Sequence, residues 1–145
     1  MSEIKAVNTL LNKYAESHQN QVNELIHFVC VPAIMWTVLG LIWVIHPLLS
    51  VAAALLALAY YISLSIPFAI GMGMMAAIML GILVVLPPGV ILPAAIIVFV
   101  VAWIFQFIGH KIEGKKPSFF DDVRFLLIGP LFVLGFLYRR LNITY

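Results

Sequence analysis

The stretch LIHFVCVPAIMWTVLGLIWVI, residues 25–45, opens a run in which no aspartate, glutamate, lysine or arginine occurs before Lys111. Of the 145 residues, 64% are hydrophobic and 10% are charged, against about 45–50% and about 25% in soluble domains. This composition excludes an ordinary soluble globule and a disordered chain. The uncharged run has the length of about four bilayer crossings of roughly 20 residues each.

Proline and glycine divide this run into four apolar stretches, which we expect to be transmembrane helices because a helix satisfies its own backbone hydrogen bonds in lipid. The links between them are very short, so successive helices should be antiparallel. The third stretch carries small residues suited to close helix contact, namely Gly71, Gly73, Ala76, Ala77 and Gly81. The expected helices cover residues 25–45, 48–65, 68–86 and 90–109.

An even number of crossings places both flanks of the run on one side of the membrane. All eight lysines and arginines lie in these flanks, which predicts a cytoplasmic location for the N-terminus and for the loop 110–124. No signal peptide is apparent, since the N-terminus lacks a basic start followed at once by an apolar run. The membrane would be a bacterial inner membrane or the endoplasmic reticulum.

Each flank also contains an apolar element. Apolar and aromatic residues at Ile4, Val7, Leu11 and Tyr14 form one helical stripe, which is typical of an amphipathic helix at the membrane interface. The last apolar run, residues 125–138, has 14 residues, about 21 Å as a helix. We expect it to be re-entrant or interfacial, with a fifth, tilted crossing that recruits Phe119 and Phe120 as the alternative.

The fold expected from these patterns is all-α and polytopic, with an N-terminal amphipathic helix, four transmembrane helices and a C-terminal hydrophobic segment. Residues 1–145 form a single membrane domain. Its parts are an amphipathic cytoplasmic segment (1–24), a four-helix bundle (25–109), and a cytoplasmic loop with the C-terminal hydrophobic segment (110–145).

Polar side chains at the ends of the bundle are the candidates for chemistry, because membrane helices contain few without cause. They form two stripes, one at the start of the first membrane helix (Asn20, Asn23 and His27) and one at the end of the fourth (Gln106, His110 and Glu113). Within each stripe the spacing keeps the side chains on one helix face. Since the number of crossings is even, both stripes lie at the same depth and could face each other.

His18 and His46 need separate arguments. His18 lies about 180° around a continuous helix from His27, so it joins the stripes only if the chain breaks near residues 17–21, where Ser17 or Asn20 could cap a new helix. His46 is at the far end of the first helix, about 28 Å from His27 along the axis. We therefore expect His46 to have a turn or interface role.

Imidazoles and a carboxylate at one depth suit a non-haem Fe(II) or a Zn(II) centre, and the single cysteine, Cys30, excludes a cysteine-rich one. Spacing alone does not choose between iron, which would indicate an oxygenase, and zinc, which would indicate a hydrolase. Each of these residues also has a purely structural interpretation. His27 would be a core histidine, Asn20 and Asn23 would cap a helix or form interhelical hydrogen bonds, and Glu113 would form a surface ion pair.

At these residues the sequence resembles a known family. The stretch HQNQVNELIH, residues 18–27, followed by Val31-Pro32, is similar to the N-terminal motif of the membrane 2-hydroxy fatty acid dioxygenases, a family with a characterised fungal member in the endoplasmic reticulum. The stretch WIFQFIGHKIEGKKPS, residues 103–118, is similar to its second motif. The later run LIGPLF, residues 127–132, also fits, so the resemblance covers nearly the whole chain.

The resemblance implies an Fe(II)-dependent dioxygenase that uses O2 and no 2-oxoglutarate, and that shortens 2-hydroxy fatty acids by one carbon in α-oxidation. It implies that His18, His27 and His110 bind the iron, supported by Asn23 and Gln106. Glu113 follows His110 by three residues, where the family pattern often has four, so the resemblance implies either a metal ligand or a supporting role for Glu113.

The partners expected are a long-chain 2-hydroxy fatty acid, O2 and the bilayer, with the acyl tail among the apolar helices. Lys111, Lys115 and Lys116 could attract the substrate carboxylate. Nothing in the sequence supports nucleic-acid binding, and homo-oligomerisation stays open. The competing functions are a zinc-dependent lipid hydrolase and a non-enzymatic membrane scaffold or lipid-binding protein.

Overall fold

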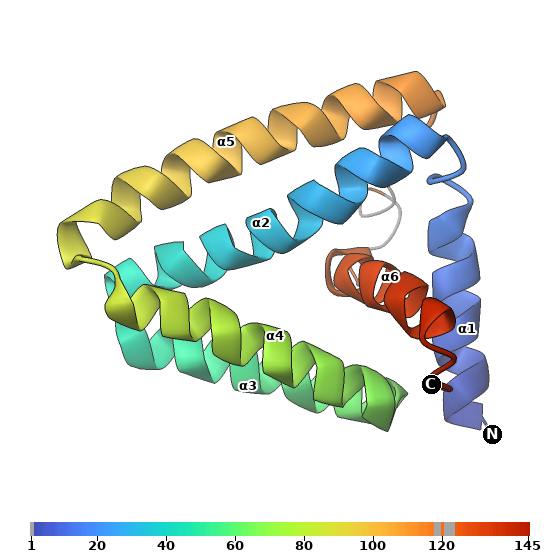
Figure 1. The fold of residues 1–145 in the computed structure, drawn as a ribbon, viewed down its shortest axis with the longest axis horizontal. Helices are drawn as coiled ribbons and strands as arrows, with labels where there is room; N and C mark the ends of the chain where they lie inside the picture. Colours follow the sequence, from blue (N-terminus) through green and yellow to red (C-terminus); the bar gives the residue numbers. More distant parts are fainter. Residues whose placement is uncertain (1, 118–119, 121–123) are drawn as a thin grey trace.

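The structure of the chain is a computed structural model that describes residues 2–117, 120 and 124–145. Every regular element in this part of the chain is a helix, with 3₁₀ geometry at Phe120 alone. The α-helices, in chain order, are α1 (Ser2–Ala15), α2 (Gln21–Ile45), α3 (Pro47–Leu64), α4 (Ile66–Val85), α5 (Pro88–Glu113) and α6 (Phe125–Arg140) (Figure 1).

Four helices, α2 to α5, are long and apolar enough to cross a membrane, which confirms the predicted number. Two of them extend beyond their apolar stretches. α2 begins at Gln21 because Asn20 caps it, and α5 continues to Glu113 before Gly114 ends it in the left-handed conformation, with φ 78°. The polar stripes are therefore continuous with the membrane helices rather than parts of the loops.

The four long helices form two antiparallel pairs, α2 beside α5 and α3 beside α4 (Figure 1). The link between α2 and α3 is a single residue, His46, whose Nδ1 accepts a hydrogen bond from the backbone N–H of Leu48. This confirms the turn role predicted for His46. Ser65 makes an equally short link between α3 and α4.

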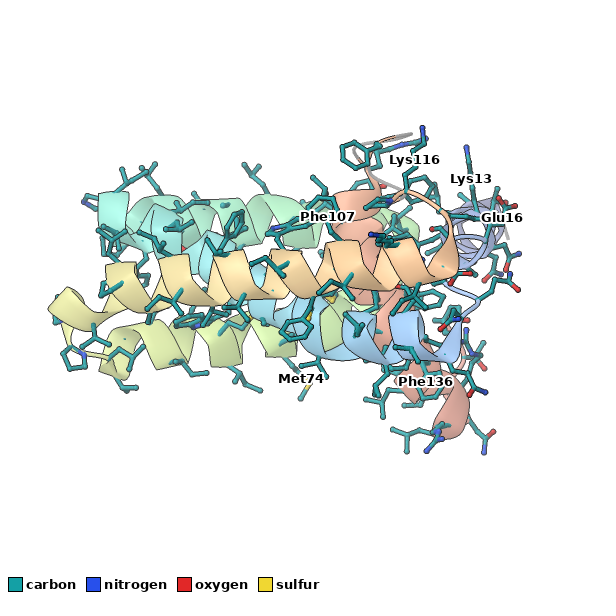
Figure 2. The ribbon with its side chains drawn as sticks, turned by 90° about the horizontal axis from the view of Figure 1, so that it is seen from above. Lys13, Glu16, Met74, Phe107, Lys116 and Phe136 are labelled. Carbon is teal, nitrogen blue, oxygen red and sulfur yellow. The ribbon has the colours of Figure 1, made fainter. Side chains whose placement is uncertain are left out.

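The two outer helices, α1 and α6, lie across one end of the bundle (Figures 1 and 2). The labelled Lys13, Glu16 and Lys116 are also at this end (Figure 2). The stripe of α1 does not face lipid: Val7, Leu11 and Tyr14 are buried, and α1 contacts α6 and α3. The amphipathic helix is thus confirmed, but its apolar face packs against the protein.

Helix α6 closes this end of the bundle. Most of its residues are buried, among them Phe125, Ile128 and Leu131, and Tyr138 donates a hydrogen bond to the carbonyl of Pro67 at 2.6 Å. α6 is not among the helices long enough to span, which fits the interfacial interpretation. Phe119, which the alternative fifth crossing would recruit, lies outside the described residues.

Two hydrophobic clusters hold the bundle together. The first joins α1, α3, α4 and α6 at the end just described, and it includes Phe68, Ile128 and Leu131. The second is at the opposite end, where Leu39, Met79, Leu83 and Ile91 bring together α2, α4 and α5. A cavity extends between the two clusters and is lined by residues of both, among them Tyr61 and Leu39.

Candidate metal centre

The chain breaks between α1 and α2, as the placement of His18 required. α1 ends at Ala15, and a turn brings the backbone N–H of His18 to the carbonyl of Ala15 at 3.0 Å. The side chain of Asn20 then accepts hydrogen bonds from the backbone N–H groups of Val22 and Asn23, and α2 begins. This turn directs His18 toward the face of α2 that carries His27.

Three imidazoles from three separate segments meet at this point. The ring centroid of His18 is 4.5 Å from that of His27 and 4.8 Å from that of His110. Each of the three side chains is at most 5% exposed. The two polar stripes, from opposite ends of the chain, therefore lie at one depth and converge on His18.

Tyr14, on α1, joins this cluster. Its hydroxyl lies 2.8 Å from Nε2 and 3.2 Å from Nδ1 of His27. Burial raises the pKa of Tyr14 above its usual value, so the phenol stays protonated and can donate to the imidazole. Phe132, on α6, covers the cluster from another side, with its ring centroid 5.7 Å from His18 and 5.8 Å from His27.

His18 is held in one tautomer. Its Nδ1 lies 2.8 Å from the carbonyl oxygen of Tyr14 and must donate to it. Burial lowers the pKa of His18 to about 4, so the ring is neutral at pH 7. A neutral imidazole with its proton on Nδ1 presents a bare lone pair on Nε2, which is the state that a metal ion requires.

Two of the imidazole nitrogens in the cluster are buried without a hydrogen-bond partner among the described residues, Nε2 of His18 and Nδ1 of His110. A buried polar atom without a partner costs folding free energy unless an ion or a water molecule binds it. Bare imidazole nitrogens are donors of the kind that divalent metals such as Fe(II) and Zn(II) bind. In the described ranges, however, no group of three or more His, Cys, Asp or Glu side chains is arranged so that it could hold a metal ion, and the Tyr14 hydroxyl lies against both ring nitrogens of His27. Side chains would have to rotate to bind an ion.

Glu113 and Asn23 connect α5 to the start of α2. Oε1 of Glu113 accepts hydrogen bonds from the backbone N–H of Asn20 at 2.7 Å and from Nδ2 of Asn23 at 3.3 Å. Nδ2 of Asn23 also donates to the carbonyl of Ser17 at 3.0 Å. The carboxylate of Glu113 therefore holds the turn that carries His18 against the end of α5, as a clamp.

A cavity of about 730 Å³ begins at the cluster and lies between the helices. His27, His110, Gln106 and the Tyr14 side chain line one end of it, whereas His18 contacts His27 and His110 but does not line the cavity. No charged side chain of the described residues lines the cavity, and most of its wall comes from apolar side chains of α2, α3 and α4. A ligand that fits it would have a small polar head and a long apolar body.

The remaining predicted residues lie outside the cavity. Lys111, Lys115 and Lys116 are exposed and do not line it. Sequence reasoning missed Tyr14 and Phe132 as members of the site. Tyr14 precedes His18 by four residues on the same stripe, and this spacing was the signal that could have identified it.

Comparison with protein families identifies the family of this chain. Residues 4–141 match a protein-family model described as "2-hydroxy-palmitic acid dioxygenase Mpo1-like". No curated protein and no solved structure matches the chain. The matched range includes the three histidines, Tyr14 and all of the cavity-lining residues.

Proposed function

Because the chain belongs to the 2-hydroxy-palmitic acid dioxygenase Mpo1-like family, we propose that it is a membrane dioxygenase that acts on long-chain 2-hydroxy fatty acids. The observation that carries this proposal is the position of the histidine cluster at the polar end of a long apolar cavity. A 2-hydroxy fatty acid has the same asymmetry, with a hydroxyl and a carboxylate on one end of an acyl chain.

The histidines are the proposed metal ligands. His18, His27 and His110 would hold Fe(II), and the bare lone pair on Nε2 of His18 and the unpartnered Nδ1 of His110 support this assignment. Imidazole nitrogens suit iron better than the hard cations Mg²⁺ and Ca²⁺. Bound Fe(II) would supply the redox chemistry that lets O2 react with the substrate.

The other residues of the site would bind and shield the substrate. The Gln106 amide and the Tyr14 hydroxyl, both at the polar end, can hydrogen-bond the hydroxyl and carboxylate of the acid. Phe132 and α6 cover the cluster and would keep water from the reacting head. The exposed Lys111, Lys115 and Lys116 would attract the carboxylate before it enters, an effect that salt should weaken.

The reaction balances without a further cosubstrate. One 2-hydroxy acid and one O2 would give the acid one carbon shorter, carbon dioxide and water. The test is O2 uptake by the purified protein, loaded with Fe(II) under anaerobic conditions and given 2-hydroxypalmitic acid. We expect O2 uptake coupled to formation of pentadecanoic acid, and no uptake with palmitic acid, which lacks the hydroxyl.

The same assay separates the competing functions. A zinc-dependent hydrolase would be active with Zn(II) on lipid esters and would consume no O2. A scaffold or lipid-binding protein would bind no stoichiometric metal. If the Fe(II)-loaded protein binds 2-hydroxypalmitic acid but consumes no O2, the proposed dioxygenase function is wrong.

A further inference from the structure

The cavity that starts at the histidines runs toward the opposite side of the membrane domain. The deepest lining residue on α2 is Ile42, fifteen residues after His27 and about 22 Å away along the helix axis. Val51 on α3 and Leu80 on α4 line the same end of the cavity. Its length therefore matches an extended acyl chain rather than a compact ligand.

The far end of the cavity borders the second hydrophobic cluster. Leu39 lines the cavity and is also a buried member of the second hydrophobic cluster, with Leu83 and Ile91. Leu80 and Ala54 pack against this cluster. Because these residues belong to the packed cluster or contact it, we expect an acyl chain that enters from the histidine end to stop at this level.

Small side chains keep the middle of the cavity open. Ala54 and Ala57 on α3 and Gly73 and Ala76 on α4 line it. α3 runs from the far end to the histidine end, so the lining positions Val51, Ala54 and Ala57 sit at successive depths, about 4.5 Å apart along the helix.

We propose that the cavity is an acyl-chain gauge, in which Ile42, Val51 and Leu80 form a floor that sets the longest acid the protein accepts. The inference rests on the proposed function for the identity of the head group, but its geometry depends only on the cavity. A larger side chain on α3 that fills part of the cavity should shift the preference to shorter fatty acids. A smaller side chain at the floor should shift it to longer fatty acids.

The narrowing test uses Ala54→Phe and Ala57→Phe. Binding of 2-hydroxydecanoic, 2-hydroxymyristic and 2-hydroxypalmitic acids is measured by displacement of a fluorescent fatty acid from the full chain in detergent. Ala54→Phe should lower the affinity for 2-hydroxypalmitic acid by about tenfold or more, because a few methylenes of the acyl chain would stay unburied. Its affinity for 2-hydroxydecanoic acid should equal that of the wild type. Ala57→Phe, which is closer to the histidines, should also lower the affinity for 2-hydroxymyristic acid.

The enlarging test uses Leu80→Ala. Removal of this side chain from the floor should raise the affinity for 2-hydroxystearic acid relative to 2-hydroxypalmitic acid. A damaged fold cannot produce such a gain, so this variant decides the question if Ala54→Phe fails to fold. Leu56→Phe is the matched control, because Leu56 is on the same helix but is 74% exposed and does not line the cavity.

The outcomes separate the gauge from the reaction. A change in chain preference without O2 uptake would support the gauge and reject the dioxygenase function. O2 uptake by the wild type with an unchanged chain preference in both Ala54→Phe and Leu80→Ala would overturn the gauge and leave the dioxygenase function standing.

Discussion

The ring of Tyr14 lies parallel to the imidazole of His18, with centroids 4.2 Å apart and planes 9° apart. Since the Tyr14 hydroxyl also lies 2.8 Å from Nε2 of His27, one side chain of α1 orients two of the three proposed ligands. The helix α1, which crosses the end of the bundle, is thus part of the site.

This relationship predicts different costs for two substitutions at Tyr14. Tyr14→Phe keeps the stacked ring but removes the partner of a buried imidazole nitrogen, which should lower the free energy of unfolding by about 1–3 kcal/mol. Tyr14→Ala also removes the ring and should cost about 3–5 kcal/mol. Thermal unfolding in detergent measures both. Equal stability of Tyr14→Phe and the wild type would contradict the assigned hydrogen bond.

At Gly109, α5 lies in close contact with α2. A Cβ atom added there would overlap Oδ1 of Asn23 and lie 3.3 Å from its Cγ, so Gly109→Ala should push α5 away from α2 beside His110. We expect loss of stability and reduced metal binding. Gly81→Ala is the control, because a Cβ at Gly81 meets nothing within 4 Å, and it should be neutral or stabilising by up to about 1 kcal/mol. Similar behaviour of the two variants would show that the close contact is unimportant.

The role of Glu113 can be decided by two substitutions. Its Oε1 accepts from the backbone of Asn20 and from Asn23, and the amide oxygen of a glutamine can do the same. We expect Glu113→Gln to keep metal and activity near wild-type levels and Glu113→Ala to lose stability. If Glu113 were instead a metal ligand, Glu113→Gln would lose the metal, which elemental analysis of the purified variant would show.

Much of the site follows from patterns that a sequence contains directly. The even number of apolar stretches placed His27 and His110 at one depth. The angular offset of His18 predicted a break near residues 17–21 if His18 belongs to the site. Both arguments use only helical periodicity and the bilayer thickness, which act locally along the chain. The structure confirms the convergence of the two stripes.

The parts that were missed depend on side-chain packing between distant segments. Phe132 reaches the cluster only because α6 lies across the bundle end, and nothing in residues 125–138 specifies that orientation. The cavity likewise results from the separation of α2 from α3 and α4, which small residues such as Ala54 and Gly73 permit but do not determine. The clamp made by Glu113 depends on the position of the turn before α2.

The most direct test of the central claim is the amount of iron bound per chain after anaerobic loading with Fe(II) and removal of excess metal. We predict one iron per wild-type chain, loss of that iron in His18→Ala, His27→Ala and His110→Ala, and full retention in His46→Ala, since His46 caps α3 far from the cluster. Wild-type protein without iron, or iron that survives His27→Ala and His110→Ala but is lost in His46→Ala, would contradict the account.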